Sequence, residues 1–163
     1  MDESLLIPIN LQKALGDRRS FISDGAAERV RLEYFKHTQL GQLVARAHFG
    51  AETEGPPGLV HSAAISGSLL EAMIFAAWSQ GCGVLSMRFS TAFKQMLPLH
   101  TSALIDTALE MDGPRLTIRA SLTTQHGMQS SIYAEAEGLF MAIPASKFGV
   151  DGVKVAQMFA ALS

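Results

Sequence analysis

The run from residue 64 to 81, AISGSLLEAMIFAAWSQG, restricts the fold of this chain more than any other segment. It is rich in Ala, Leu and Met, which favour helix, and Gly81 is suited to end one. Its apolar residues lie all around the helix axis, so almost every face must be covered. Because Ser66, Ser68 and Glu71 interrupt it as a membrane span, we expect a helix enclosed by a concave protein surface.

Segments that alternate apolar and polar residues flank this helix. Residues 27–38 and 39–50 predict two antiparallel strands. Further strands are predicted at residues 84–93, 102–112, 115–125 and 128–143, joined by tight turns. A curved antiparallel sheet wrapped around one helix would bury that helix, so the pattern predicts an α+β fold.

The length of 163 residues suits one domain, 1–163, with a sizeable core. We expect an N-terminal helical extension over 1–26, with a short amphipathic helix near 9–16, and a C-terminal extension over 145–163. Apolar residues make up 48% of the chain and charged ones 17%, which also suits an oligomer that buries surface between subunits.

The charge pattern argues against several classes of partner. The net charge is −2 and no run of Lys or Arg occurs, so neither nucleic acid nor a membrane surface is an expected partner. The histidines lack metal-ligand spacing, so no metal site is predicted. Cys82 is the single cysteine and the N-terminus lacks a secretory signal, which together suggest a cytoplasmic protein.

Glu71 is the only charge in the apolar helix. Burying a carboxylate without a partner costs several kcal/mol or raises its pKa. It therefore serves either as a general base or nucleophile, or as a buried carboxylate paired with Arg or Lys at a subunit interface.

Three separated motifs carry a family resemblance: GPPGLVH before the helix, LSMRFSTAFKQMLPL after it, and AEAEGLFMAIP near the end. In this order they resemble the hotdog-fold acyl-CoA thioesterases of the phenylacetyl-CoA type, over about residues 44–144. The resemblance implies a homodimer or dimer of dimers with active sites at the subunit interface. It implies an acyl-CoA substrate and no cofactor besides the coenzyme A within that substrate.

The resemblance also assigns roles to residues of the helix start and the next strand. His61 matches the family's histidine, and Ser62 and Ala63 stand where two glycines are usual. Their backbone N–H groups would polarise the thioester carbonyl. Ser86 falls where the family often holds the attacking water.

The position of the family's acid is open between two alignments. Counting nine residues from His61 reaches Leu70, whereas a one-residue insertion would place Glu71 there. One helical step turns a side chain by about 100°, so the alignments aim the acid at different walls. Gly58, Leu70 and Met73 are the residues expected to contact substrate, with Met73 a core residue that doubles as part of the acyl-chain wall.

Thioester hydrolysis with Glu71 as the base is the function that these residues favour. A non-catalytic acyl-CoA or small-ligand binding protein is the main alternative, suggested by Leu70 and the altered glycines. A hydroxyacyl dehydratase or hydratase using His48 with Glu71 is less favoured, because those residues lie too far apart in the sequence.

Overall fold

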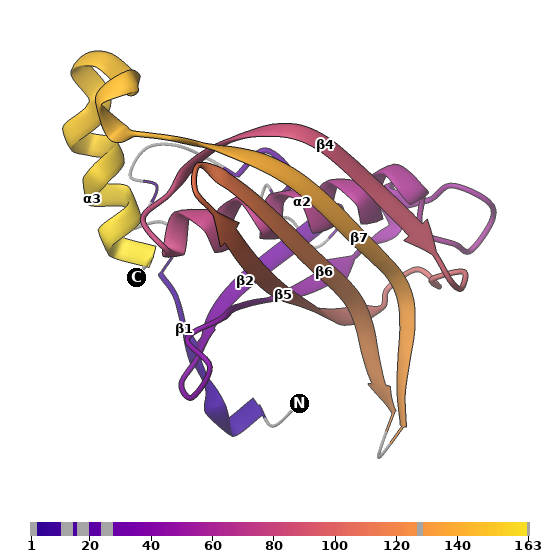
Figure 1. Ribbon diagram of the computed structural model, residues 1–163. Coiled ribbons are helices and arrows are strands. Elements are labelled where there is room, and N and C mark those ends of the chain that lie inside the picture. Colours follow the sequence, from indigo (N-terminus) through magenta and orange to yellow (C-terminus); the bar gives the residue numbers. More distant parts are fainter. Residues whose placement is uncertain (1–2, 11–14, 16–19, 24–27, 127–128, 163) are drawn as a thin grey trace.

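A seven-stranded antiparallel sheet curves around one long helix in the computed structural model (Figure 1). The structure describes residues 3–10, 15, 20–23, 28–126 and 129–162. The helix is α2, Ser62–Ser79. The strands are β1 Leu6–Pro8, β2 Val30–His37, β3 Leu43–Phe49, β4 Gly83–Phe93, β5 Ser102–Asp112, β6 Arg115–His126 and β7 Gln129–Ile143, in the spatial order β1-β2-β3-β5-β6-β7-β4.

The predicted α+β architecture is confirmed, because one antiparallel sheet encloses α2. The described part of residues 1–26 differs from the expected helical extension. It contains a 3-10 turn, Glu3–Leu5, and then β1, which pairs with β2. The helix expected near 9–16 lies mostly outside the described residues. At the other end, η3 Ala145–Asp151 and α3 Gly152–Leu162 complete the chain.

Both ends of α2 have identifiable caps. The helix begins two residues earlier than predicted because His61, in extended conformation, accepts the Ala63 N–H on its side chain. At the C-terminal end, Gly81 N donates to Trp78 O at 2.9 Å and Cys82 N donates to Ala77 O at 3.0 Å. These two bonds form a Schellman motif, and Gly81 takes the positive φ of 76° that it requires.

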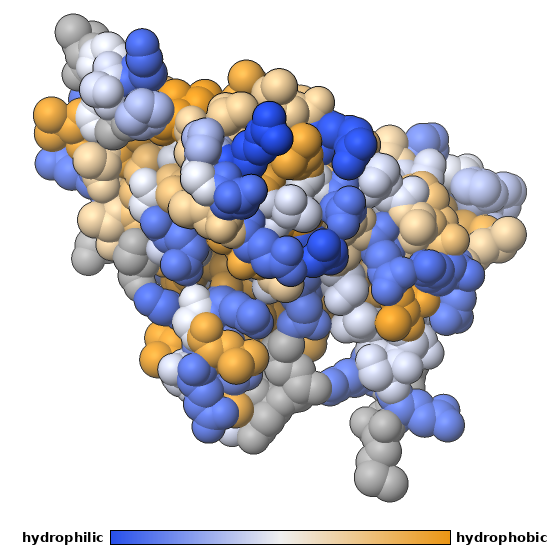
Figure 2. Space-filling view, in the orientation of Figure 1, coloured by the Kyte–Doolittle hydropathy of each residue, from blue (hydrophilic) through white to orange (hydrophobic). Residues whose placement is uncertain are grey.

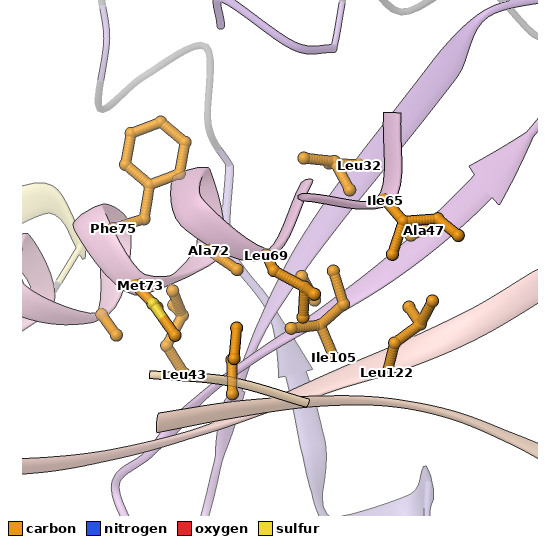
Figure 3. Packing of buried hydrophobic residues seen from close by; sticks show 14 of the residues in the cluster. Leu32, Leu43, Ala47, Ile65, Leu69, Ala72, Met73, Phe75, Ile105 and Leu122 are labelled. Atoms are coloured by element: carbon orange, nitrogen blue, oxygen red, sulfur yellow. The ribbon is translucent and has the colours of Figure 1, made fainter. Parts of the chain in front are cut away.

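The concave side of the sheet and the inner face of α2 form one hydrophobic core (Figure 3). Leu69, Ala72 and Met73 of the helix are fully buried, and Ile105 of β5 and Leu122 of β6 pack in the same cluster. Burial of these side chains positions the helix along the sheet and so fixes where its N-terminus and its single carboxylate lie.

The face of α2 that the sheet does not reach is covered from both ends of the chain. Trp78 packs against Phe159 of α3 with ring centroids 6.0 Å apart. Nearer the helix start, Ile22 contacts Gly67 so closely that an added Cβ there would lie 2.7 Å from Ile22 Cδ1. By length and hydropathy α2 would pass as a membrane span, but 56% of it is buried inside this fold, as in a core helix.

Strand β4 lies at one edge of the sheet and pairs only with β7 among the described strands. Its Leu85 and Met87 are more than half exposed. Figure 2 shows apolar residues, in orange, on the rim of the molecule where β4 runs. An unpaired edge that carries apolar side chains is suited to pairing with another strand.

A β-bulge interrupts β4. Ser86 lies opposite Phe140 and Arg88 lies opposite Leu139, so Met87 is an extra residue on this strand. Because paired residues share a face, Ser86 points to the same side of the sheet as the buried Phe140, which is the side of α2.

Candidate active site

The loop before α2 is tied down by its own hydrogen bonds. His61 N donates to Thr53 O at 2.7 Å, and Val60 N donates to Leu97 O at 2.8 Å. Gly55 packs directly on His61, because an added Cβ would lie 2.9 Å from His61 Cα. The start of the helix and the histidine before it are therefore held in fixed positions.

The hydrogen bond that caps α2 also sets the tautomer of His61. Ala63 N donates to His61 Nδ1 at 3.0 Å, so in the neutral ring Nε2 carries the proton. The exposed ring thus offers an N–H donor at the helix N-terminus. Of the two backbone amides expected to polarise a carbonyl, that of Ala63 is engaged by this cap, and no described group accepts the N–H of Ser62.

A cleft of about 390 Å³ opens at this helix N-terminus. Its polar wall includes His61 and Ser62, and its other walls are mainly apolar. Besides these two residues, Pro56, Leu59, Val60, Ile65, Phe93, Gln95, Met96 and Leu97 line it. A cleft with hydrogen-bond donors at one end and apolar walls can hold a polar group joined to an apolar chain.

Glu71 lies elsewhere on α2, under the N-terminal segment. The carboxyl group is buried, with 8% of the residue exposed. The Ser20 hydroxyl donates to Oε1, and Ile22 N donates to Oε2 at 2.9 Å. Neither hydrogen-bond partner is the Arg or Lys that a structural ion pair would have supplied.

Burial raises the pKa of Glu71, and hydrogen bonds from Ser20 and from the backbone of Ile22 and Phe21 offset part of that rise. Tyr34 of β2 is close enough for the Glu71 charge to affect it. The pKa of Tyr34 is raised well above its ordinary value, mainly by burial and further by Glu71. A carboxyl group with a raised pKa is suited to accept a proton near neutral pH.

The backbone donors at the start of α2 and the Glu71 carboxylate, which the expected mechanism needs together, are well separated within one chain. Glu71 follows Ser62 by nine residues, which corresponds to about 13.5 Å along a helix axis. A carbonyl oxygen must lie about 3 Å from its donors. The helix start and Glu71 of the same chain therefore do not meet at one carbonyl.

The chain is similar in sequence to two curated acyl-coenzyme A thioesterases. Human acyl-coenzyme A thioesterase THEM5 is 25% identical over 131 residues, which cover 78% of this chain and 52% of the human protein. Mouse THEM5 is 25% identical over 146 residues, covering 86% of the chain and 58% of the relative. The chain thus spans about half the length of the curated relatives it matches. No protein-family model matches it.

Solved structures agree on the fold. A Streptococcus mutans protein bound to acetyl-CoA superimposes with a TM-score of 0.63 at 17% identity, covering 79% of this chain and 95% of that one. The E. coli PaaI protein of the phenylacetic acid degradation operon gives 0.57 at 14% identity, with coverage of 62% and 72%. The resemblance to hotdog-fold thioesterases is confirmed.

Within the hotdog fold, the residues expected to contact substrate fall in three different places. Gly58, with a φ of 77°, donates its N–H to Glu54 Oε1 in the loop. Met73 is fully buried against β7, where its sulfur lies near Gly138. Leu70 is half-buried on α2, about 60° around the axis from Met73, so it adjoins the flank that faces β7.

Residues 70 and 71 of the hotdog helix, the two positions where the family's acid could lie, therefore face different strands of the sheet. Glu71 shares a face with Phe75, one turn later, which meets the Tyr34 ring of β2 edge to face at 4.9 Å. Leu70 lies on the side toward β7. The exposed Ser86 of β4 points to the helix side of the sheet, as its expected role requires, but it does not line the cleft.

The hotdog sheet directs His48 away from Glu71. Ala47 and Phe49 are buried in the core around α2, so His48 between them points to the opposite face, where its Nδ1 contacts Ser102 Oγ at 3.2 Å. This orientation does not favour a dehydratase pair. Among the described residues, no group of three metal-binding side chains occurs.

Sequence reasoning missed the segment Ser20–Ile22 as part of this site. Two of its contacts to Glu71 come from backbone N–H groups, which every residue except proline possesses, so no residue type marks them.

Proposed function

We propose that this protein hydrolyses an acyl-CoA thioester to a free acid and coenzyme A. The observation that carries the proposal is the apolar cleft at the N-terminus of α2, with donors from His61 and Ser62 at its polar end. The similarity to THEM5, named as an acyl-coenzyme A thioesterase, supports the same substrate class.

The donors suit the charge that develops during hydrolysis. When water attacks a thioester, the carbonyl oxygen becomes negative, and preorganised N–H groups at a helix N-terminus stabilise that charge. Ser62 N–H and His61 Nε2–H are the two donors for this oxygen, and the Ala63 N–H keeps the His61 ring in place.

Glu71 is the proposed general base, and Ser86 holds the attacking water. Since Glu71 and the helix start of one chain lie too far apart along α2, the base reaches a carbonyl bound at the α2 N-terminus of a second chain. The active site thus lies between two subunits. Gly58 and Leu70 would border the substrate, and Met73 would support the wall from the core.

A binding protein without turnover is the second candidate. The observation that favours it is that the Glu71 carboxylate is already hydrogen-bonded by Ser20 and Ile22 while Leu70 occupies the helix flank toward β7. Such a protein would retain the cleft and its donors but lack a base.

Two assays on the same protein separate these candidates. We expect free-thiol release from a panel of aliphatic and aromatic acyl-CoA thioesters, and saturable binding of a non-hydrolysable acyl-CoA thioether. Binding without thiol release from any member of the panel would favour the binding protein. Absence of both would contradict the acyl-CoA proposal.

The exposed edge of β4 is the proposed dimer contact. We expect Met87→Lys to shift the protein from dimer to monomer in sedimentation velocity, because a charge would be placed where two apolar edges meet. Met111→Lys, at a similarly exposed methionine on β5, is the matched control and is expected to leave the assembly unchanged. Dimers that persist in the Met87 variant would place the interface elsewhere.

A further inference from the structure

The segment from Ser20 to Ser23, which we name the strap, covers Glu71. Its Ser20 hydroxyl and its Ile22 N–H bind the two oxygens of the carboxylate, and Ser23 N donates to Ser20 Oγ at 2.7 Å. The strap therefore supplies both a charge-assisted contact and the internal bond that orients the serine.

The strap rests on α2 at a glycine. Ile22 packs against Gly67 because this residue has no side chain. A Cβ added at Gly67 would lie 2.7 Å from Ile22 Cδ1. At its far end Ser23 forms a bridge with Val30 and accepts the Leu32 N–H at 2.9 Å. The strap is thus anchored to β2 at one end and held over α2 by Ile22 and Glu71.

The apolar contact of the strap is limited to one side chain. Ile22 packs against the core at Gly67, whereas Phe21 is 94% exposed and its ring adds almost no buried area. Hydrogen bonds to one carboxylate carry much of the attachment, and each such bond contributes modestly because water competes for the same groups. Few buried apolar contacts and polar attachment are typical of segments that open locally.

A second hydroxyl group, that of Tyr34, lies on the wall of the core that Glu71 faces. Tyr34 is 2% exposed, and its hydroxyl has no hydrogen-bond partner among the described residues. Its ring packs on Phe75, one turn from Glu71 on the same helix face. A buried hydroxyl without a partner is costly, and the Glu71 carboxylate is the acceptor on that face.

We propose that the strap Ser20–Ser23 closes over Glu71 in the resting protein, that it must withdraw before Glu71 can activate water, and that the Tyr34 hydroxyl then binds the carboxylate in its place. This inference rests on the proposed thioester hydrolysis. In the closed state both carboxylate oxygens accept hydrogen bonds and the strap excludes water. In the open state one donor remains, which keeps the buried charge paired and leaves lone pairs for a water molecule.

The strap is tested first without an activity assay, by amide hydrogen exchange at Ile22. Ser20→Ala removes the hydroxyl that donates to Glu71 and accepts the Ser23 N–H, so it is expected to speed exchange at this amide at least about tenfold, the effect of losing one hydrogen bond to a charged group. Ser90→Ala is the matched control, because Ser90 lies exposed on β4 and points to the side of the sheet opposite α2. Unchanged exchange at Ile22 in the Ser20 variant would show that Ser20 does not hold the strap closed, and would overturn the proposal.

Gating is tested by thiol release from the best acyl-CoA thioester of the panel. Ser20→Ala is expected to raise kcat severalfold, and Tyr34→Phe to lower it at least tenfold while exchange at Ile22 stays at or below the wild-type rate. Faster exchange at Ile22 in Ser20→Ala with an unchanged kcat would show that opening of the strap does not limit catalysis. The proposed thioester hydrolysis would still stand. If neither wild type nor Ser20→Ala releases thiol, the proposed function is wrong. The exchange rates at Ile22 then still test whether the strap closes over Glu71.

Discussion

Replacing Glu71 by Gln is expected to lower kcat/KM for thioester hydrolysis by a factor of about 10²–10⁴, the usual contribution of a general base. Gln has nearly the same shape, so its carbonyl can still accept the Ile22 N–H and its amide can face Ser20. The folded state should persist, and the loss should therefore appear in catalysis. Thiol release measures the rate, and far-UV circular dichroism verifies the fold.

The matched control is Glu110→Gln, at an exposed carboxylate that binds Arg119 on the outer surface. It removes one charge from the protein without altering α2, so activity should stay within a factor of two of wild type. Full activity in the Glu71 variant would exclude Glu71 as the base and direct attention to Ser86 and the donors at the helix start.

The same substitution should change how stability depends on pH. Burial raises the pKa of Glu71 in the folded chain above its value in the unfolded chain. Between these two values the folded protein keeps a proton that the unfolded chain has lost, so the free energy of unfolding falls as pH rises through this window. Glu71→Gln removes that contribution. Urea denaturation at several pH values measures it, and equal slopes for both proteins would contradict the shift.

Leu69→Ala is expected to lower the free energy of unfolding by about 2–5 kcal/mol. Leu69 is fully buried on the face of α2 that meets the sheet, so truncation leaves a cavity between two rigid elements. Chemical denaturation at fixed protein concentration reports the change as a lower midpoint with an unchanged m-value.

Leu40→Ala provides the comparison for this truncation. Leu40 is 62% exposed beside the β2–β3 turn, and its loss should cost less than about 0.5 kcal/mol. Similar midpoints for the two variants would mean that α2 is not held by the core contacts described above, and that its position relative to the sheet has another cause.

The architecture was predictable because the periodic signals were strong. Six strands and α2 were expected within four residues of their observed bounds, since alternation and an apolar run each depend on many residues at once. Strand β1 was missed because Leu6–Pro8 is only three residues long and contains proline. Its pairing depends on β2, which lies more than twenty residues further along the chain.

The site was predictable only in part. A lone carboxylate in an apolar helix indicated a buried Glu71 with a raised pKa, and the structure agrees. Its partners could not be inferred, because Ser20 and the Ile22 amide lie 51 and 49 residues away and leave no pattern in the sequence. Similarly, Ser62 and Ala63 looked equivalent until the His61 ring was seen to engage only the second amide.

Met87 is the one residue of β4 that has no partner on β7. Ser86, before Met87, and Phe89, after it, both point toward α2 because the bulge resets the alternation between them. Deleting Met87 would remove the bulge and leave Ser86 and Phe89 two positions apart, so both would still point toward α2 in a regular strand. A single-codon deletion here would therefore shorten the strand without exchanging the side chains offered to the helix for those offered to solvent.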